Sequence, residues 1–511
     1  MGADRARVVC TTFGRLLFRE TAHELTRRLR PAVDGARSEE GRTHAAGLRE
    51  ALEGLGPFYI KVGQLLSTRP DIVSPAVIQE LAKLHDQVTI TPFADFEPVL
   101  AGDLGPRWAT RFREIDTDRP LGAASLAQVY RAVLTDGTPV ALKVQRPGIR
   151  PVVEADMRLL RRAARVVARQ APRFNAVIDA GAMLDVLFDA MRPELDFCLE
   201  ARNMREARDH VAGFKYLTVP TVISATPRVL VQSLAPGCSI ADVRREDFTH
   251  EERAGIAGDL LAYMYRSYFL TRSFHADPHP GNILVQPGRP AALIDWGMVG
   301  RIDRPLSTSM LLVLLSLAQN DGASTARAWI EMGHATPWAD VPGFIDDMTA
   351  LVPQVAHASL AELNFGVSLT AVLEHSTKRG IKTNPMVAVL GKSFANLEGS
   401  IRSMCPELSL IDVFESELRH ITRKLAAESV SPPQVVRAAL DLMVTGNSAV
   451  QLTRGLLRDL SVGGFTVRID QPPPNRVVHS RPFAGRRAVP DLLLVLGALA
   501  WWKRRNRRSP R

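Results

Sequence analysis

Three polar residues in the second half of the chain have the types and spacing that phosphoryl transfer needs. Asp277 and Asn282 stand five residues apart in Phe274–Leu284, which has the sequence FHADPHPGNIL. Such a reaction needs a carboxylate that orients the nucleophile or takes its proton, and an amide oxygen that holds a metal at the phosphates. Asp295, in Leu293–Gly297 at the end of an expected strand, can ligate Mg²⁺ bridging two phosphates. The pattern predicts Asp277 as the catalytic base and Asn282 and Asp295 as magnesium ligands.

Two histidines in the same loop offer a zinc site as an alternative. His275 and His279 are four residues apart, which on a helix would place both on one face. Pro278 and Pro280 forbid that helix, so we expect the histidines to brace the loop by hydrogen bonding.

A lysine earlier in the chain fits the phosphate end of the same site. Lys143 stands late in the apolar strand-like run Val140–Val144, where its ammonium can meet two phosphates of a nucleotide. For an isolated match of this length, an exposed strand lysine beside Asp136 is the simpler interpretation. The functional interpretation therefore depends on a carboxylate that orients the lysine.

The acidic segment 194–200, with the sequence ELDFCLE, can supply that carboxylate. We expect one helix from about Ala182 to His210, with Asp196 and Glu200 on one face at i,i+4. A solvated acidic face is the alternative, but interleaved apolar residues favour partial burial. The segment therefore offers Asp196 and Glu200 as candidate carboxylates for Lys143.

The elements around these residues follow the order of a bilobal kinase. Helices are expected over residues 1 to about 100, 152–168 and 251–269, and the chain is expected to be mainly helical up to about 465. Strands are expected at 112–115, 127–134, 140–144, 217–222, 229–233, 283–286 and 291–294, with a hinge at 236–237. Together with the ordered set Lys143, Glu200, Asp277, Asn282 and Asp295, this predicts an α+β, protein-kinase-like fold.

Two further segments carry a resemblance to the UbiB/AarF family. The loop Pro120–Ser125 is alanine-rich where an ordinary kinase has GxGxxG, and Lys61 to Gln64 is similar to the family's KxGQ motif. The resemblance covers about Gly56 to Asp303. It implies that the KxGQ helix folds over the active site, with Lys61 meeting the ExD acids Glu194 and Asp196. It also implies that Glu200 is the partner of Lys143. The residues it assigns are nucleotide-binding Gly122, Ala123, Ala124 and Ser125, catalytic Lys143, Glu200 and Asp277, and regulatory Lys61, Gln64, Glu194 and Asp196.

The resemblance implies ATP and Mg²⁺ as cofactors and an ATPase or a small-molecule or lipid kinase. Such a protein would support isoprenoid-quinone or lipid homeostasis together with components of that biosynthesis. No long activation segment separates Gly297 from the helix near Pro305, so phosphorylation of proteins is disfavoured. Two alternatives stay open: an aminoglycoside/choline-type phosphotransferase, which shares the HxDxHPGN loop, and a scaffold gated by nucleotide without turnover.

Composition and the C-terminal residues suggest where such a protein acts. The 511 residues carry a formal net charge of +10, which favours phosphates, nucleotides or anionic lipid headgroups. Charge alone does not rule out nucleic acid, but with the resemblance none is expected, and a homodimer is left open. Residues 488–502 are almost wholly apolar and are followed by the basic residues Lys503, Arg504, Arg505, Arg507 and Arg508, which predicts a membrane-facing tail. We expect the chain at the cytoplasmic side of the cell membrane, peripheral or anchored by this tail.

Five segments are predicted in chain order. They are a helical extension at 1–105, a kinase-like N-lobe at 106–235, a helical C-lobe at 236–465, a linker at 466–487 and the tail at 488–511.

Overall fold

The computed structural model describes most of the chain up to Ser429. The described residues are 5–9, 11–12, 36–67, 69, 71–84, 90–170, 172–357 and 365–429. The described residues fall into two units, one up to Val413 and one that begins at Phe414. The predicted linker and tail lie outside the described residues, as does Cys10. Within the described part of the chain, no helix combines the length and apolarity that a membrane crossing requires.

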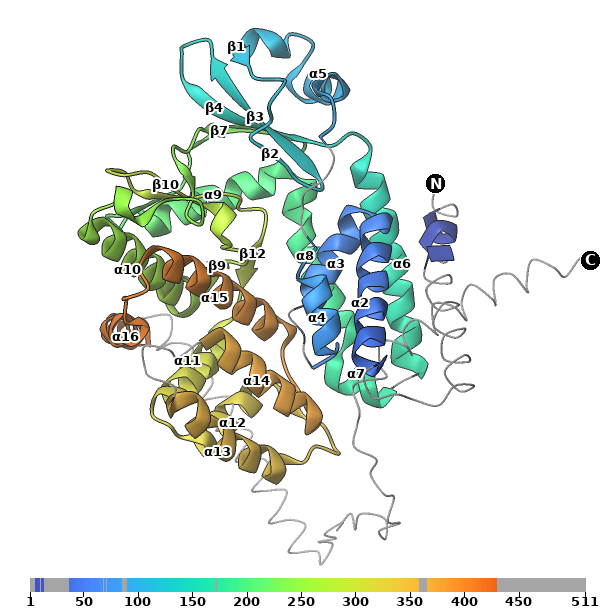
Figure 1. Ribbon diagram of the computed structural model, residues 1–511, viewed down its shortest axis with the longest axis vertical. Helices are drawn as coiled ribbons and strands as arrows, with labels where there is room; N and C mark the ends of the chain where they lie inside the picture. Colours follow the sequence, from blue (N-terminus) through green and yellow to red (C-terminus); the bar gives the residue numbers. More distant parts are fainter. Residues whose placement is uncertain are drawn as a thin grey trace, which may run out of the picture. The chain divides into compact units, whose positions relative to one another are not determined.

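A six-stranded antiparallel sheet, at the top of Figure 1, carries Lys143, the predicted phosphate-binding lysine. Its strand order is β1-β3-β4-β7-β6, with β2 paired to β3. Lys143 on β4 lies between Val129 of β3 and Leu230 of β7, so the strand is central and its position is fixed from both sides. The strands are β1 Phe112–Ile115, β2 Gly122–Ala123, β3 Ala127–Leu134, β4 Pro139–Gln145, β6 Val222–Ala225 and β7 Val229–Ser233.

The N-terminal helices share one hydrophobic core with two helices of the kinase-like lobe. These are α2 Ala36–Leu55, α3 Pro57–Leu66, α4 Pro75–Leu81, α6 Ile149–Gln170 and α8 Ala180–Leu195. Leu52, Phe58 and Leu81 of the extension are buried together with Phe188 and Met191 of α8. This shared burial fixes α3 beside α8, the two elements that carry Lys61 and Glu194.

The expected single helix across the acidic segment is wrong. The helix α8 ends at Leu195, and α9 Phe197–Val211 begins after Asp196, whose backbone is extended at φ −146°. Asp196 is the N-cap of α9, and its side chain accepts a hydrogen bond from the Cys198 amide. Pro193 in the last turn of α8 and the capping carboxylate together divide the helical run in two.

The expected strand over 217–222 is also divided. β5 Leu217–Thr218 pairs parallel to β11, whereas β6 Val222–Ala225 belongs to the six-stranded sheet. Pro220, which has no N–H to give to a ladder, lies between them.

The C-terminal part is mainly helical, as expected, and its short strands present the catalytic loop. The expected hairpin at 283–294 is present as the antiparallel pair β10–β11. β12 pairs with β9 only a few residues after Asp295, and α11 then begins at Arg304. The strands are β8 Cys238–Ser239, β9 Ser273–His275, β10 Ile283–Val285, β11 Ala291–Leu293, β12 Val299–Arg301, β13 His334–Ala335 and β14 Ile381–Lys382. The helices are α5 Glu97–Leu104, α7 Pro172–Ile178, α10 His250–Arg266, α11 Arg304–Ala318, α12 Gly322–Met332, α13 Val341–His357, α14 Phe365–Lys378, α15 Pro385–Met404 and α16 Leu410–Ser429.

Candidate active site

Lys143 is held by two carboxylates from different parts of the chain. Its Nζ lies 2.8 and 2.9 Å from the two carboxylate oxygens of Glu200 and 3.4 Å from Oδ1 of Asp295. The side chain of Glu200 is 2% exposed and that of Lys143 10%, while Asp295 is 42% exposed. The pair expected between Lys143 and Glu200 is therefore present, and the more accessible Asp295 remains able to meet a ligand.

The charges in this cluster shift each other's protonation. Burial acts to lower the pKa of Lys143, but Asp295, Glu200 and Glu194 outweigh it, so the pKa is raised and the ammonium stays charged. Burial, reinforced by Asp295 and opposed by Lys143, raises the pKa of Glu200 to about 7. Burial also acts to raise the pKa of Asp295, yet Lys143, Lys61 and the Gly297 amide hold it below its usual range. Asp295 is thus an anion, as a metal ligand must be.

Asp295 occupies an unusual backbone conformation. Its φ is +57°, in the left-handed region where aspartate and asparagine are tolerated best after glycine. The residue directly follows Ile294, whose amide donates to the carbonyl oxygen of Asn282. The two predicted magnesium ligands are therefore tied by a backbone bond across the site.

The catalytic loop is braced by its histidines, as expected. Nδ1 of His275 accepts from the Asp277 amide, and its Nε2 lies 3.2 Å from the carbonyl oxygen of Ile294. Nδ1 of His279 accepts from the Gly281 amide at 3.1 Å. Burial lowers the pKa of His275, so this ring is neutral and can accept that bond. Among the described residues, no three histidine, cysteine, aspartate or glutamate side chains gather into a group that could hold a metal ion.

Asp277 and Asn282 lie together in this loop. Nδ2 of Asn282 donates a hydrogen bond to the carbonyl oxygen of Asp277 at 3.0 Å. Oδ1 of the same amide is then the atom that can act as a metal ligand. Carboxylate and amide oxygens are the hard ligands that Mg²⁺ prefers, so the donor set of Asn282 and Asp295 fits this ion.

Two residues that the sequence did not indicate hold the candidate base. Lys392 Nζ lies 3.1 Å from Oδ1 of Asp277, and Nδ2 of Asn396 donates to the same oxygen at 2.8 Å. Both come from α15, which packs against the turn Pro280–Asn282. Burial acts to raise the pKa of Asp277, but Lys392, Lys61 and His279 hold it below its ordinary value. No local motif links Lys392 to a loop more than a hundred residues earlier.

The KxGQ helix reaches this site through its lysine. Lys61 Nζ lies 3.5 Å from Oε1 of Glu194, and its charge also acts on Asp277 and Asp295. Gln64 instead donates to the carbonyl oxygen of Leu84, so its amide fastens α3 to the end of α4. Asp196, the second ExD acid, caps α9. Lys61 therefore forms the expected ion pair with Glu194, whereas Asp196 accepts a hydrogen bond from the Cys198 amide.

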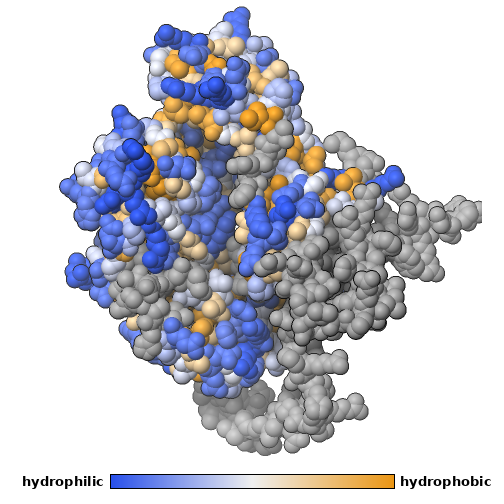
Figure 2. Space-filling view, viewed as in Figure 1, coloured by the Kyte–Doolittle hydropathy of each residue, from blue (hydrophilic) through white to orange (hydrophobic). Residues whose placement is uncertain are grey.

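Part of the alanine-rich loop pairs with β3, the strand beside the one that carries Lys143. Gly122 and Ala123 form β2 against β3, and the Ala124 carbonyl oxygen accepts from Nε of Arg146. Ser125 is buried. Hydrophilic residues line the hollow below the six-stranded sheet (Figure 2).

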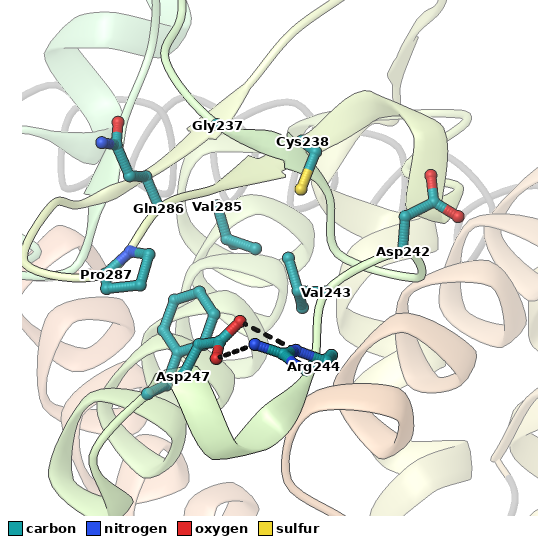
Figure 3. A pocket seen from close by; sticks show the side chains of 10 residues that line it. Gly237, Cys238, Asp242, Val243, Arg244, Asp247, Val285, Gln286 and Pro287 are labelled. Atoms are coloured by element: carbon teal, nitrogen blue, oxygen red, sulfur yellow. Dashed lines mark hydrogen bonds and ion pairs between the residues drawn. The ribbon is translucent and has the colours of Figure 1, made fainter.

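A pocket of about 530 Å³ lies beside the hinge and is lined by none of the predicted site residues. Figure 3 shows Arg244 and Asp247 paired along one side of it, at 3.0 Å. Gly237 at its edge has a φ of +92°, and a Cβ there would lie 2.1 Å from the carbonyl oxygen of Val285, so this hinge position requires glycine.

The fold and the five converging side chains define an atypical kinase-like protein. Residues 83–328 match the family model described as the ABC1 atypical kinase-like domain. The chain belongs to the UbiB/AarF family, as its motifs indicated.

Relatives support this membership over most of the chain. A protein of Aeromonas hydrophila named probable protein kinase UbiB is 31% identical over 380 residues, covering 73% of this chain and 69% of the relative. An uncharacterized protein of Synechocystis is 32% identical over 368 residues, covering 69% of this chain and 89% of the relative. Among solved structures, the Rv3197–erythromycin complex from Mycobacterium tuberculosis aligns at 23% identity with a TM-score of 0.46, covering 73% of this chain and 98% of that chain.

Proposed function

We propose that this chain binds MgATP and transfers or hydrolyses its terminal phosphate, as an ATPase or a small-molecule or lipid kinase. Its place would be isoprenoid-quinone or lipid homeostasis at the membrane, which the family resemblance suggests. The observation that carries the proposal is Lys143 between Glu200, at 2.8 Å, and Asp295, at 3.4 Å. A buried ammonium held between an orienting carboxylate and a metal-ligating one is what the phosphates of a nucleotide require.

Each residue has a role in this proposal. Lys143 binds phosphate oxygens, and Glu200 holds its ammonium in place. Asn282 and Asp295 would hold Mg²⁺, which neutralises charge on the phosphates when bound. Asp277, with its lowered pKa, suits a carboxylate that orients a hydroxyl and takes its proton late in the reaction.

Phosphorylation of protein substrates is disfavoured by two features of the same site. α3 contacts α8, and Lys61 pairs with Glu194 beside the metal-ligating segment. The connection from Gly297 to α11 consists mainly of β12, which is paired with β9. The packed helix and the paired strand argue against an open segment for docking a peptide.

Asp295→Asn tests the metal assignment. Asparagine tolerates the left-handed backbone at this position, so the variant should fold while losing the anionic ligand. We expect magnesium-dependent nucleotide binding, followed by calorimetry, to fall at least a hundredfold, and phosphate release to fall with it. Asp179→Asn is the matched control, because Asp179 also has a positive φ, of 49°. Full retained activity in Asp295→Asn would remove the assignment.

Two measurements distinguish the alternative functions, an aminoglycoside/choline-type phosphotransferase and a nucleotide-gated scaffold: which substrate is phosphorylated, and whether phosphate is released. Direct phosphorylation of an aminoglycoside or choline by the purified chain would favour the small-molecule phosphotransferase. Nucleotide binding without phosphate release, with or without anionic liposomes, would favour the scaffold.

A further inference from the structure

A mainly apolar pocket is lined in part by Lys392, the residue whose ammonium contacts the candidate base. Its volume is about 210 Å³, and it lies between α4, α14 and α15. Its walls include Ile78, Leu369, Leu373, Val387 and Ala388. An apolar cavity of about 150 Å³ is sufficient to bind benzene, so this pocket has room for a larger apolar group.

Lys392 connects this pocket to Asp277. The residue lines the pocket, and its ammonium lies 3.1 Å from Oδ1 of Asp277. Asn396 uses the same oxygen, so Oδ2 remains as the atom that can take a proton. The walls of the pocket are mainly apolar, although Ser67 and Thr370 also line it, and Lys392 connects it to the base.

We propose that this pocket binds the apolar body of an alcohol, whose hydroxyl is then presented to Asp277 as the phosphate acceptor. The inference rests on the proposed function and names the acceptor class for it. An alcohol with a branched or cyclic body of about six to ten carbons would fit the apolar walls and also place a hydroxyl near Lys392. Its body replaces empty space in the pocket.

The transfer step conserves atoms and charge. The hydroxyl oxygen forms a bond to the terminal phosphorus of ATP, and the bond from that phosphorus to the bridging oxygen breaks, leaving its electron pair on ADP. The hydroxyl proton passes to Oδ2 of Asp277. The products are an alkyl phosphate and ADP.

Two glycines of α15 give a matched pair of variants. Gly391 lines the pocket and is buried, and a Cβ placed on it meets no atom within 4 Å. Gly391→Leu should therefore fill the pocket without displacing backbone. Gly399, on the same helix, also has open space around its Cβ but is exposed, so Gly399→Leu makes the same helix-favouring change outside the pocket.

The test uses the full chain with methyl labels and 2-cyclohexylethanol as the probe. In wild type and Gly399→Leu, we expect the Ile78 methyl signal to shift on titration, while that of exposed Ile223 stays constant. In Gly391→Leu, we expect the apparent affinity to fall at least tenfold. With MgATP, wild type and Gly399→Leu should form 2-cyclohexylethyl phosphate, detected by mass spectrometry, and ethanol should give no product.

The outcomes separate this inference from the proposed function. If the wild type does not bind MgATP, both the proposed function and this inference are overturned. With MgATP binding intact, the inference alone is overturned by an unshifted Ile78 signal, by equal titration of Gly391→Leu, or by binding without alkyl phosphate.

Discussion

The candidate base is held by side chains from a helix that begins at Pro385, far from its own loop in the chain. Lys392 and Asn396 share one oxygen of Asp277, so this carboxylate has one constrained oxygen and one available to a nucleophile. The arrangement makes Lys392 a positioning residue whose charge also sets the protonation of Asp277.

Lys392→Met should shift the acidic limb of the pH–rate profile. Lys392 is the largest of the charges that lower the pKa of Asp277, so its removal raises that pKa. The acidic limb of kcat/KM should then move to higher pH, whereas a purely structural loss would lower the rate at every pH equally. Lys378→Met, which removes an exposed lysine paired with Glu374, is the control and should leave the profile in place.

Glu200→Gln should change how stability depends on pH. The pKa of Glu200 is raised from 4.5 to about 7 in the fold, so the folded state holds a proton that the unfolded state has lost. Its contribution is fully present below about pH 4.5 and is lost as pH rises through 7. Denaturant unfolding from pH 4 to 8 should therefore show wild type losing stability relative to Glu200→Gln. Parallel curves for the two proteins would contradict the raised pKa.

For single residues, the sequence predicts those that belong to local motifs. It does not predict those that reach the site only through packing of distant helices. The loop 277–282 and Asp295 could be predicted because their spacing is local and the chemistry restricts the residue types. The Lys143–Glu200 pair required the resemblance. Lys392 could not be predicted, since its contact depends on how α15 packs on the turn at Pro280.

Among the elements, the break between α8 and α9 decides the role of an acid. Asp196 caps the helix that carries Glu200, so its side chain fixes where that helix begins. The apolar periodicity runs through this point, which is why a continuous helix was predicted. Propensity does not show that a single aspartate will leave the helix to cap the next one.

Substitutions at Asp196 can separate capping from charge. Asp196→Ala should cost about 1 kcal/mol of stability and lower hydrogen-exchange protection in the first turn of α9. Asp196→Asn should retain nearly all of both, because asparagine caps as well as aspartate. If Asn proved as damaging as Ala, the negative charge rather than the cap would be the important property.

For the molecule as a whole, the helical extension is packed into the kinase-like fold and is not a separate module. Besides sharing a core with α8, it is bonded to the C-terminal helices, since Thr377 donates to Asp71 at 3.0 Å and Asp71 pairs with Arg69. The bilobal α+β class could be predicted from element order, but this bridging could not, because it joins residues about three hundred positions apart.

Deletion of residues 488–511 tests the predicted membrane-facing tail. Each basic residue near an anionic surface contributes about 1 kcal/mol, and the tail combines six basic residues with an apolar run. We expect the truncated chain to lose most of its cosedimentation with anionic vesicles while it still binds MgATP. Undiminished cosedimentation would place the membrane contact elsewhere.

The short segment after Asp295 limits how this site can be switched. From Gly297 to Arg304, where β12 pairs with β9, there is no serine, threonine or tyrosine. A covalent phosphate, which orders the corresponding loop in many signalling kinases, has no hydroxyl there to attach to. A phosphorylation switch of the kind that orders an activation loop is therefore not expected within residues 297–304.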